Sequence, residues 1–309
     1  MVLPFYLKRS QAMKQKNRKK TNITPYLFIA PQIILFCIFF LIPAGMGVFA
    51  AFTKWDIFSP EMPTFVGLAN FKEILFNAES TYYRFFRTGF TNTLIFVVLA
   101  VPLCIVLPLL MALAIHKKPF GHKFFQSLFY MPTVLSISTV ILIWYYMFNK
   151  NLGLINNFFH LKTNWLGKQP TAWFAIVLVT VWWTIGTNMV IYIAALNGVS
   201  QDILEAASVD GASSTRKFFS IVLPSIRNQL SYTVVLTTVA QFNIYGQPLM
   251  LTSGGPNNST NVLLMVIRDL AFPSFGGKSI SGLASAMALM LGIVMIAIAL
   301  LQYRFVGDE

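Results

Sequence analysis

Long apolar runs constrain this chain more than any other feature of its sequence. A transmembrane helix needs about 20 consecutive apolar residues, and six runs meet that length: 25–53, 92–115, 124–148, 172–196, 226–249 and 283–303. The first run is too long for the apolar region of a signal peptide, which covers roughly 7–15 residues, so we expect an uncleaved first span. The sequence therefore predicts an all-α, polytopic membrane protein with six transmembrane helices.

The composition agrees with a membrane protein. Hydrophobic residues make up 56% of the chain and charged residues 11%, whereas soluble domains carry roughly 25% charged residues. The net charge of +13 could suggest nucleic acid. The basic residues, however, are dispersed between the apolar runs, as in a protein with a basic cytoplasmic side. We therefore expect a lipid bilayer and no nucleic acid as a partner.

The distribution of basic residues also predicts the orientation. Residues 1–24 hold seven Lys and Arg side chains and no acid, and such segments stay on the cytoplasmic side. With six spans, the segments 116–123 and 198–225 and the tail after residue 303 lie on that same side. We expect a basic cytoplasmic arm over 1–24, a membrane domain over 25–309, and both termini in the cytoplasm.

A polar loop at 200–224 interrupts the apolar runs. Asp202 can cap a short helix, and Glu205 has the spacing to complete a capping box. Gly211 can provide the left-handed residue that ends this helix, and a serine two or three residues later can open a second helix. The loop is suited to docking against another protein, and it contains no obvious catalytic group.

Catalytic and metal-binding patterns are missing from the sequence. It contains no HExxH, CxxC or GxSxG motif and no acidic metal cluster. The segment Gly276-Gly277-Lys278-Ser279 resembles the end of a phosphate-binding loop, but Phe272 replaces the required first glycine. No Asp, Glu or His lies inside a predicted span, which also disfavours proton-coupled transport. We expect neither enzymatic activity, nor a metal site, nor a cofactor bound by this chain.

Uncharged polar residues follow helical spacing on two predicted spans. On the fourth span they are Thr180, Thr184 and Thr187, with Trp183 and Asn188 at the edges; on the fifth they are Thr237, Gln241 and Tyr245, with Thr238 and Asn243 nearby. Such side chains can simply join helices, each contributing roughly 0.6–2 kcal/mol. For Gln241 and Asn243 a pathway role is nearly as favoured, because amides in lipid are costly unless they face a cavity. Hydroxyl, amide and aromatic groups without charge suit a neutral polyol such as a sugar.

Two shorter features of the sequence also carry structural predictions. Thr133 and Ser136 fall in the inner half of the third predicted span, where we expect contacts between helices. Residues 71–76, in the loop that precedes the second span, are expected to form a short amphipathic helix at the membrane interface.

The 200–224 loop resembles a known motif. Glu205-Ala206-Ala207, Asp210-Gly211-Ala212, Phe218 and Ile221-x-Leu223-Pro224 are similar to the EAA loop of ABC-importer permeases. FVGLANFKEI at 65–74, NWLG at 164–167 and LTSGGPNNST at 251–260 resemble the maltose-type, carbohydrate-uptake branch of that family. The resemblance extends from about residue 25 to the C-terminus.

This resemblance implies the fold of a type I ABC importer permease in a bacterial inner or plasma membrane. It implies a second permease subunit, two cytoplasmic ATPases that hydrolyse the ATP, and an extracellular solute-binding protein that delivers a sugar. The EAA loop would form a coupling helix: Glu205 would pair with a basic residue of the ATPase, Ala206 and Ala207 would allow close approach, and Gly211 would make the turn. Sugar contacts would fall near Thr180, Thr184 and Thr187 and around Ala240, Gln241, Asn243 and Ile244. The chain looks like the six-span core of the family.

A stand-alone secondary transporter or channel for a neutral polar solute is the alternative. It would require transport without partners, and an internal repeat is common in such proteins. The sequence shows no clear repeat and no intramembrane acid.

Overall fold

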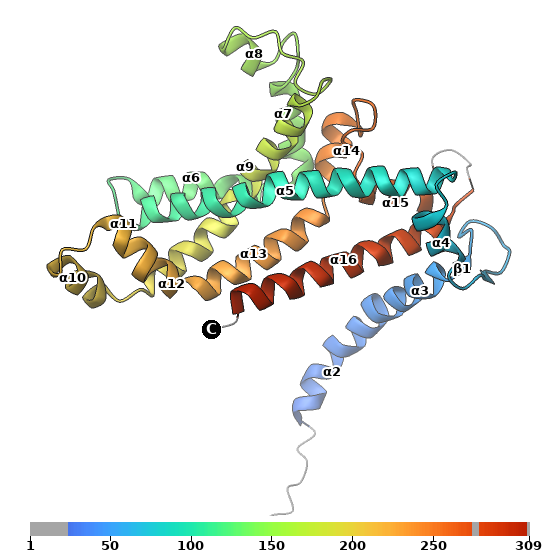
Figure 1. Ribbon diagram of the computed structural model, residues 1–309, viewed down its shortest axis with the longest axis horizontal. Helices are drawn as coiled ribbons and strands as arrows, with labels where there is room; N and C mark the ends of the chain where they lie inside the picture. Colours follow the sequence, from blue (N-terminus) through green and yellow to red (C-terminus); the bar gives the residue numbers. More distant parts are fainter. Residues whose placement is uncertain (1–23, 274–277, 308–309) are drawn as a thin grey trace, which may run out of the picture. The chain divides into compact units, whose positions relative to one another are not determined.

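The computed structural model describes residues 24–273 and 278–307 (Figure 1). The chain divides into two compact units, Met1–Phe49 and Ala50–Glu309, which we describe separately. The predicted basic arm, apart from its last residue, lies outside the described residues, and so do Gly276 and Gly277.

The first predicted span begins in the first unit, and its last two helical residues, Ala50 and Ala51, belong to the second. It runs through α2 (Thr24–Phe36), a π-helical turn η1 (Cys37–Leu41) and α3 (Ile42–Ala51). Residues 25–51 are long and apolar enough to cross a membrane. The π-turn ends two residues before Pro43, whose ring removes one backbone donor and crowds the preceding helical turn.

The second unit is a helical bundle with one short antiparallel β-hairpin, β1 (Thr53–Lys54) paired with β2 (Thr64–Phe65). Its helices are α4 (Ala69–Phe76), α5 (Thr81–His116), α6 (His122–Val134), α7 (Ile137–Met147), α8 (Leu154–Phe158), α9 (Thr171–Asn197), α10 (Gln201–Val209), α11 (Ser214–Lys217), η2 (Phe218–Val222), α12 (Leu223–Ser225), α13 (Arg227–Phe242), α14 (Gly246–Thr252), α15 (Leu263–Ala271) and α16 (Ser281–Gly307). The helices α5, α9, α13 and α16 run lengthwise, with α10 at one end of the unit and α4 and α15 at the other (Figure 1). The predicted short helix at 71–76 is confirmed as part of α4; its place at a membrane interface stays a prediction.

Four of the predicted spans form continuous helices. Within the described ranges, residues 25–51, 81–116, 171–197 and 281–304 are long and apolar enough to cross a membrane. The helix α5 begins at Thr81, about three turns before the predicted start, and at 1.5 Å per residue it is longer than the hydrocarbon core.

The third predicted span is not one straight helix. The helices α6 and α7 form a pair bent by 102°. Ser136 lies at the break and starts α7, because its hydroxyl accepts a hydrogen bond from the backbone N–H of Thr139 at 3.3 Å. Thr133 in the last turn of α6 and Ser136 at the start of α7 therefore lie next to a break, so the span predicted near 124–148 is not one straight helix.

The fifth predicted span ends earlier than expected. The helix α13 stops at Phe242, and α14 begins at Gly246 after a short non-helical stretch. Pro248 lies in the first turn of α14, where its missing backbone N–H is tolerated. By length and composition, the described residues provide four spans, or five if the bent pair counts as one. The total of six stays a prediction.

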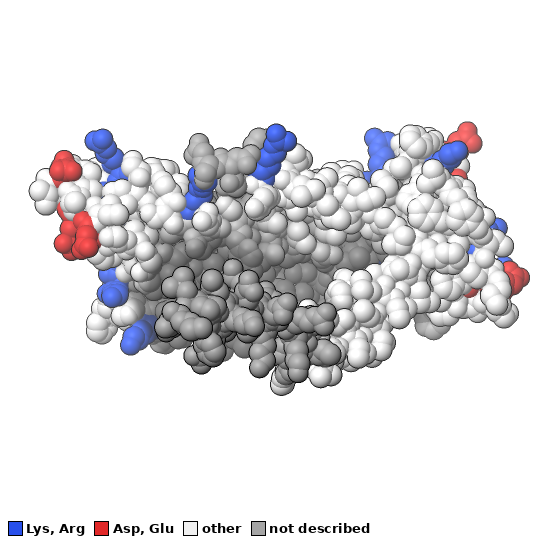
Figure 2. Space-filling model, turned by 90° about the horizontal axis from the view of Figure 1, so that it is seen from below, with Lys and Arg blue, Asp and Glu red and all other residues white. Residues whose placement is uncertain are grey.

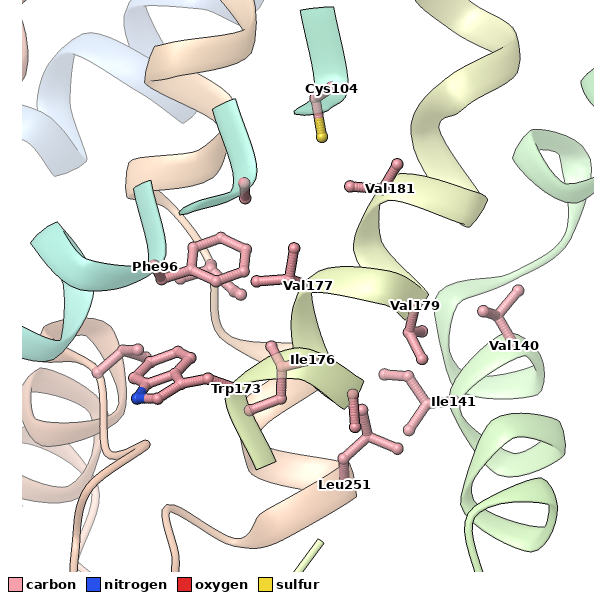
Figure 3. Close-up of a cluster of buried hydrophobic side chains, with 14 of the residues drawn as sticks. Phe96, Cys104, Val140, Ile141, Trp173, Ile176, Val177, Val179, Val181 and Leu251 are labelled. Carbon is pink, nitrogen blue, oxygen red and sulfur yellow. The ribbon is translucent and has the colours of Figure 1, made fainter. Parts of the chain in front are cut away.

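The centre of the bundle is built around α9. Phe96 and Cys104 of α5 pack there with Ile176 and Val177 of α9, and the same cluster reaches α7 and α14 (Figure 3). At the end of α5 near α15, the Asn92 side-chain amide donates hydrogen bonds to two carbonyls of the 251–262 loop, at 2.8 and 2.9 Å. This loop contains the LTSGGPNNST segment, so its conformation is tied directly to α5.

Close helix packing predicts the effect of one substitution. A Cβ atom at Gly186 in α9 would lie 2.7 Å from the Cα of Tyr130 and 2.8 Å from the carbonyl oxygen of Phe129, both in α6. Because backbone atoms block the site, Gly186→Ala should separate α6 from α9 and lower stability by about 1–3 kcal/mol. The measurement is thermal unfolding of the purified chain in detergent. Gly292→Ala in α16, where nothing lies within 4 Å, is the matched control; equal behaviour of the two variants would contradict the packing.

Candidate functional site

A cavity without charged lining residues lies between α9 and α13. It has a volume of about 200 Å³ and is lined by Thr184, Thr187, Asn188 and Ile191 of α9 and by Thr233, Leu236, Thr237, Ala240 and Gln241 of α13. The lining combines hydroxyl and amide groups with aliphatic side chains, and none of the lining residues is charged. Such a surface can exchange hydrogen bonds with a neutral polar ligand and contact its apolar faces.

Asn188 holds the three helices around this cavity together. Its side-chain amide donates to the carbonyl oxygen of Cys104 in α5 at 2.8 Å and to the hydroxyl of Thr237 in α13 at 3.0 Å. A single α9 side chain thus fixes α5 and α13 relative to each other at the cavity wall.

Gln241 differs from Asn188 in its hydrogen bonding. Its side chain is 6% exposed and lines the cavity, yet its amide makes no hydrogen bond with any of the described residues. Nearby, the hydroxyl of Thr184 donates to the carbonyl of Thr180 at 2.8 Å. As an acceptor, this hydroxyl can still receive a hydrogen bond.

The structure brings together three of the predicted pathway residues, namely Thr184, Thr187 and Gln241. The other four lie outside the cavity lining. Thr180 is buried and donates to the carbonyl of Ile176; Trp183 donates its indole N–H to the carbonyl of Leu135; Asn243 is exposed and donates to the carbonyl of Val239; and Tyr245 packs against the central apolar cluster. Asn243 and Tyr245 leave the helical face because α13 has already ended at Phe242.

Three lining residues were not singled out from the sequence: Ile191, Thr233 and Leu236. Thr233 lies four residues before Thr237 on the same helical face, so the four-residue spacing could have identified it. Ile191 and Leu236 are aliphatic and carry no signal that separates them from lipid-facing residues.

The 200–224 loop forms the predicted pair of helices with a different first cap. The N-cap of α10 is Ser200, and Asp202 lies in the first turn of the helix. The predicted capping box between Asp202 and Glu205 is therefore wrong, since the helix starts two residues earlier. Glu205 is exposed and free to face a partner.

The turn after α10 is a Schellman motif. Gly211 has φ +74°, as predicted. The N–H of Ala212 donates to the carbonyl of Ala207 at 2.9 Å, and the N–H of Gly211 donates to that of Ser208 at 3.1 Å. Ser213 then begins α11 by accepting a hydrogen bond from the N–H of Arg216 at 3.2 Å. The turn fixes the angle between the two helices of the loop.

One face of the loop is free in this chain. Asp202, Glu205 and Asp210 are exposed, and Ile203 and Val209 have 56% and 88% of their surface accessible. Figure 2 shows acidic side chains at both ends of the molecule, including the end that carries α10. An exposed helix with apolar and acidic groups is typical of a protein-docking surface.

The opposite face of the loop packs onto the ends of the long helices. Leu204, Phe218 and Val222 contact a buried group that we call the loop-end cluster: Leu109, Ala112, Ile115, Met189, Tyr192, Leu196, Val199 and Ile226. Lys217 of α11 donates a hydrogen bond to the hydroxyl of Ser208 in α10 at 2.9 Å. The loop and the adjacent ends of α5 and α9 therefore form one packed body.

A hydrogen bond connects this cluster to the cavity between α9 and α13. The hydroxyls of Tyr192 and Thr233 lie 2.7 Å apart. Tyr192 belongs to the loop-end cluster, and Thr233 lines the cavity. Contiguous side-chain contacts thus connect the 200–224 loop with the cavity.

The helices α5, α6, α7, α9, α13 and α16 contain no Asp or Glu, and no group of three or more His, Cys, Asp or Glu side chains could hold a metal among the described residues.

Comparison with known proteins identifies the family. Residues 74–307 match the family described as binding-protein-dependent transport system inner membrane component. A probable ABC transporter permease of Bacillus subtilis, YurN, is 30% identical and covers 93% of this chain and 97% of its own length. AmyD of Thermoanaerobacterium thermosulfurigenes, a probable starch degradation products transport system permease, is 31% identical over 90% of this chain and 93% of its own. UgpA of Agrobacterium fabrum, an sn-glycerol-3-phosphate transport system permease, is 31% identical over 92% of this chain and 95% of its own.

A solved structure supports the fold. A chain of a bacterial ABC transporter that imports the acidic polysaccharide alginate superposes with a TM-score of 0.77 at 20% identity, covering 92% of this chain and 95% of that one. The chain belongs to the family of binding-protein-dependent transport system inner membrane components. It is a membrane permease of an ABC importer, and these similarities favour this assignment over a stand-alone transporter.

Proposed function

We propose that this chain forms half of the translocation pathway of an ATP-driven importer for a sugar or oligosaccharide. The observation that carries the proposal is the uncharged cavity between α9 and α13, where threonine hydroxyls and two amides alternate with aliphatic groups. Sugars present many hydroxyls and apolar ring faces, and this lining matches both. The relatives named for starch degradation products and glycerol phosphate also transport polyol derivatives.

In this proposal, closure of the ATPases displaces the EAA loop. Glu205 would pair with a basic residue of the ATPase, while Ala206 and Ala207 would allow the groove of the ATPase to approach α10 closely. Asp210, Gly211 and Ala212 would set the direction of the turn. The support is their location on an exposed helix whose turn is fixed by the Schellman motif.

Transmission to the cavity follows the contacts of the loop-end cluster. A displacement of α10 would move Leu204 and Phe218 together with the ends of α5 and α9. The Tyr192–Thr233 contact would carry that displacement to the wall of the cavity. Because packed interiors deform little, such a body moves as a unit rather than by gradual bending.

The proposal implies a set of partners and an orientation. A second permease would complete the pathway, two ATPases would hydrolyse ATP beneath it, and a solute-binding protein would deliver substrate from outside. This chain would bind no cofactor. The loop and both termini would lie in the cytoplasm, which agrees with the basic segments 1–24 and 116–123.

Removing the carboxylate of Glu205 in α10 tests whether this helix couples the permease to the ATPase. Glu205→Ala should leave membrane insertion unchanged and reduce the stimulation of ATPase activity by substrate-loaded binding protein at least tenfold, because a desolvated ion pair is lost across the interface. The measurement is ATP hydrolysis by the reconstituted importer. Glu79→Ala removes an exposed carboxylate at the opposite end of the unit and should have no effect. Normal stimulation in Glu205→Ala would refute the coupling role.

Changing the cavity tests the pathway. Gln241→Leu keeps a similar volume but removes the amide, so uptake of a labelled sugar should fall about tenfold or its substrate preference should shift, since buried polar groups of the site discriminate strongly. Gln229→Leu, an exposed position on the same helix α13, is the matched control. If both variants transport like the unmodified protein, Gln241 only joins helices.

A further inference from the structure

A second and larger cavity lies beside the coupling loop. Its volume is about 610 Å³, within the range of ligand pockets. Leu113, Leu196 and Phe218 form part of an apolar wall, and His116, Lys117 and Lys217 add a basic side. The cavity is thus bounded by the ends of α5 and α9 together with α10 and α11.

The charge of this cavity favours an anion. Two lysines, Lys117 and Lys217, line the cavity with one acidic residue, Glu205. Hydroxyls from Ser214 and Thr215 line the same space and can donate to an anionic oxygen. Phosphate oxygens accept hydrogen bonds from both kinds of donor, and charge strengthens those bonds.

His116 provides a second indication. It is the last residue of α5, and its Nδ1 is buried without a hydrogen-bond partner among the described residues. Buried polar atoms of proteins are normally paired, and this ring nitrogen, on a residue that lines the cavity, has no partner within the described part of the chain.

Exposed apolar side chains of α5 lie on the same helical face as Leu113, which lines the cavity. Leu110 and Val106 lie three and seven residues before Leu113 and therefore share its helical face. They are 54% and 49% exposed. A ligand held here would have a phosphate beside the lysines and a hydrocarbon tail along α5, at the level where a transmembrane helix ends.

We propose that this cavity binds the headgroup of an anionic phospholipid. Basic pockets at the cytoplasmic ends of transmembrane helices are suited to such headgroups. The phosphate would bridge Lys117 at the end of α5 and Lys217 in α11, so the lipid would tie the coupling loop to the spans. This regulatory role rests on the coupling function proposed above, whereas lipid binding itself does not.

Direct lipid binding tests the site. The full chain in detergent is titrated with phosphatidylglycerol or phosphatidylcholine, and retained lipid is counted by native mass spectrometry. We expect one tightly retained phosphatidylglycerol per chain and no comparable retention of phosphatidylcholine. Lys117→Gln and Lys217→Gln should each weaken retention about fivefold, because one basic residue near an anionic headgroup contributes about 1 kcal/mol.

The control is Lys118→Gln, which removes an exposed lysine that does not line the cavity. Equal losses in all three variants, or equal retention of both lipids, would overturn the proposal. If inorganic phosphate at millimolar concentration binds the site in the absence of lipid, the site belongs to a soluble phosphate. That result would overturn the lipid assignment. Because this assay involves no ATPase, its result is independent of whether Glu205→Ala uncouples the importer.

Discussion

The packing of the coupling loop onto the ends of α5 and α9 is the interaction on which the functional account depends. An exposed loop joined only by its backbone could move without moving the spans. Here Leu204, Phe218 and Val222 are packed against the loop-end cluster, and the Schellman turn at Gly211 fixes the geometry between α10 and α11. The exposed face is thereby free for a partner, while the covered face is committed to the membrane bundle. This arrangement supports the proposal that the loop receives force from another protein.

The cavity lies within reach of this packed body. Tyr192 joins the loop-end cluster to Thr233, and Asn188 joins α9 to both α5 and α13. These bonds lie among apolar residues, where each is worth roughly 0.6–2 kcal/mol, so their main effect is to fix relative helix positions. The long helices of the described part contain no Asp or Glu, and in the proposed importer the energy for transport comes from ATP hydrolysis by partner subunits.

Much of this fold could be predicted from the sequence, because helices in lipid must satisfy their own backbone hydrogen bonds. The apolar runs at 25–53, 172–196 and 283–303 each became a continuous helix. Gly211 was predictable because few residues other than glycine adopt a positive φ. The breaks at Ser136 and at 243–245 were harder to predict. Both stand in apolar runs whose hydropathy gives no sign of them, and only the cap at Ser136 indicates where one helix starts again. The cavity could be predicted only in part, since helical spacing identifies a face but not which helix covers it. Thr180 and Thr184 share one spacing, yet only Thr184 lines the cavity.

The central claim is that α10 and α9 move as one body when the ATPases close. It is tested most directly by pulsed electron paramagnetic resonance on the assembled importer, with spin labels at Val209 in α10 and Thr187 in α9. On ATP binding, the distance between these two labels should change by less than about 2 Å, the scale of a small helix shift. The distance from the Thr187 label to a label on the partner permease should change by more. A large change between Val209 and Thr187, with α9 fixed relative to the partner permease, would contradict the account.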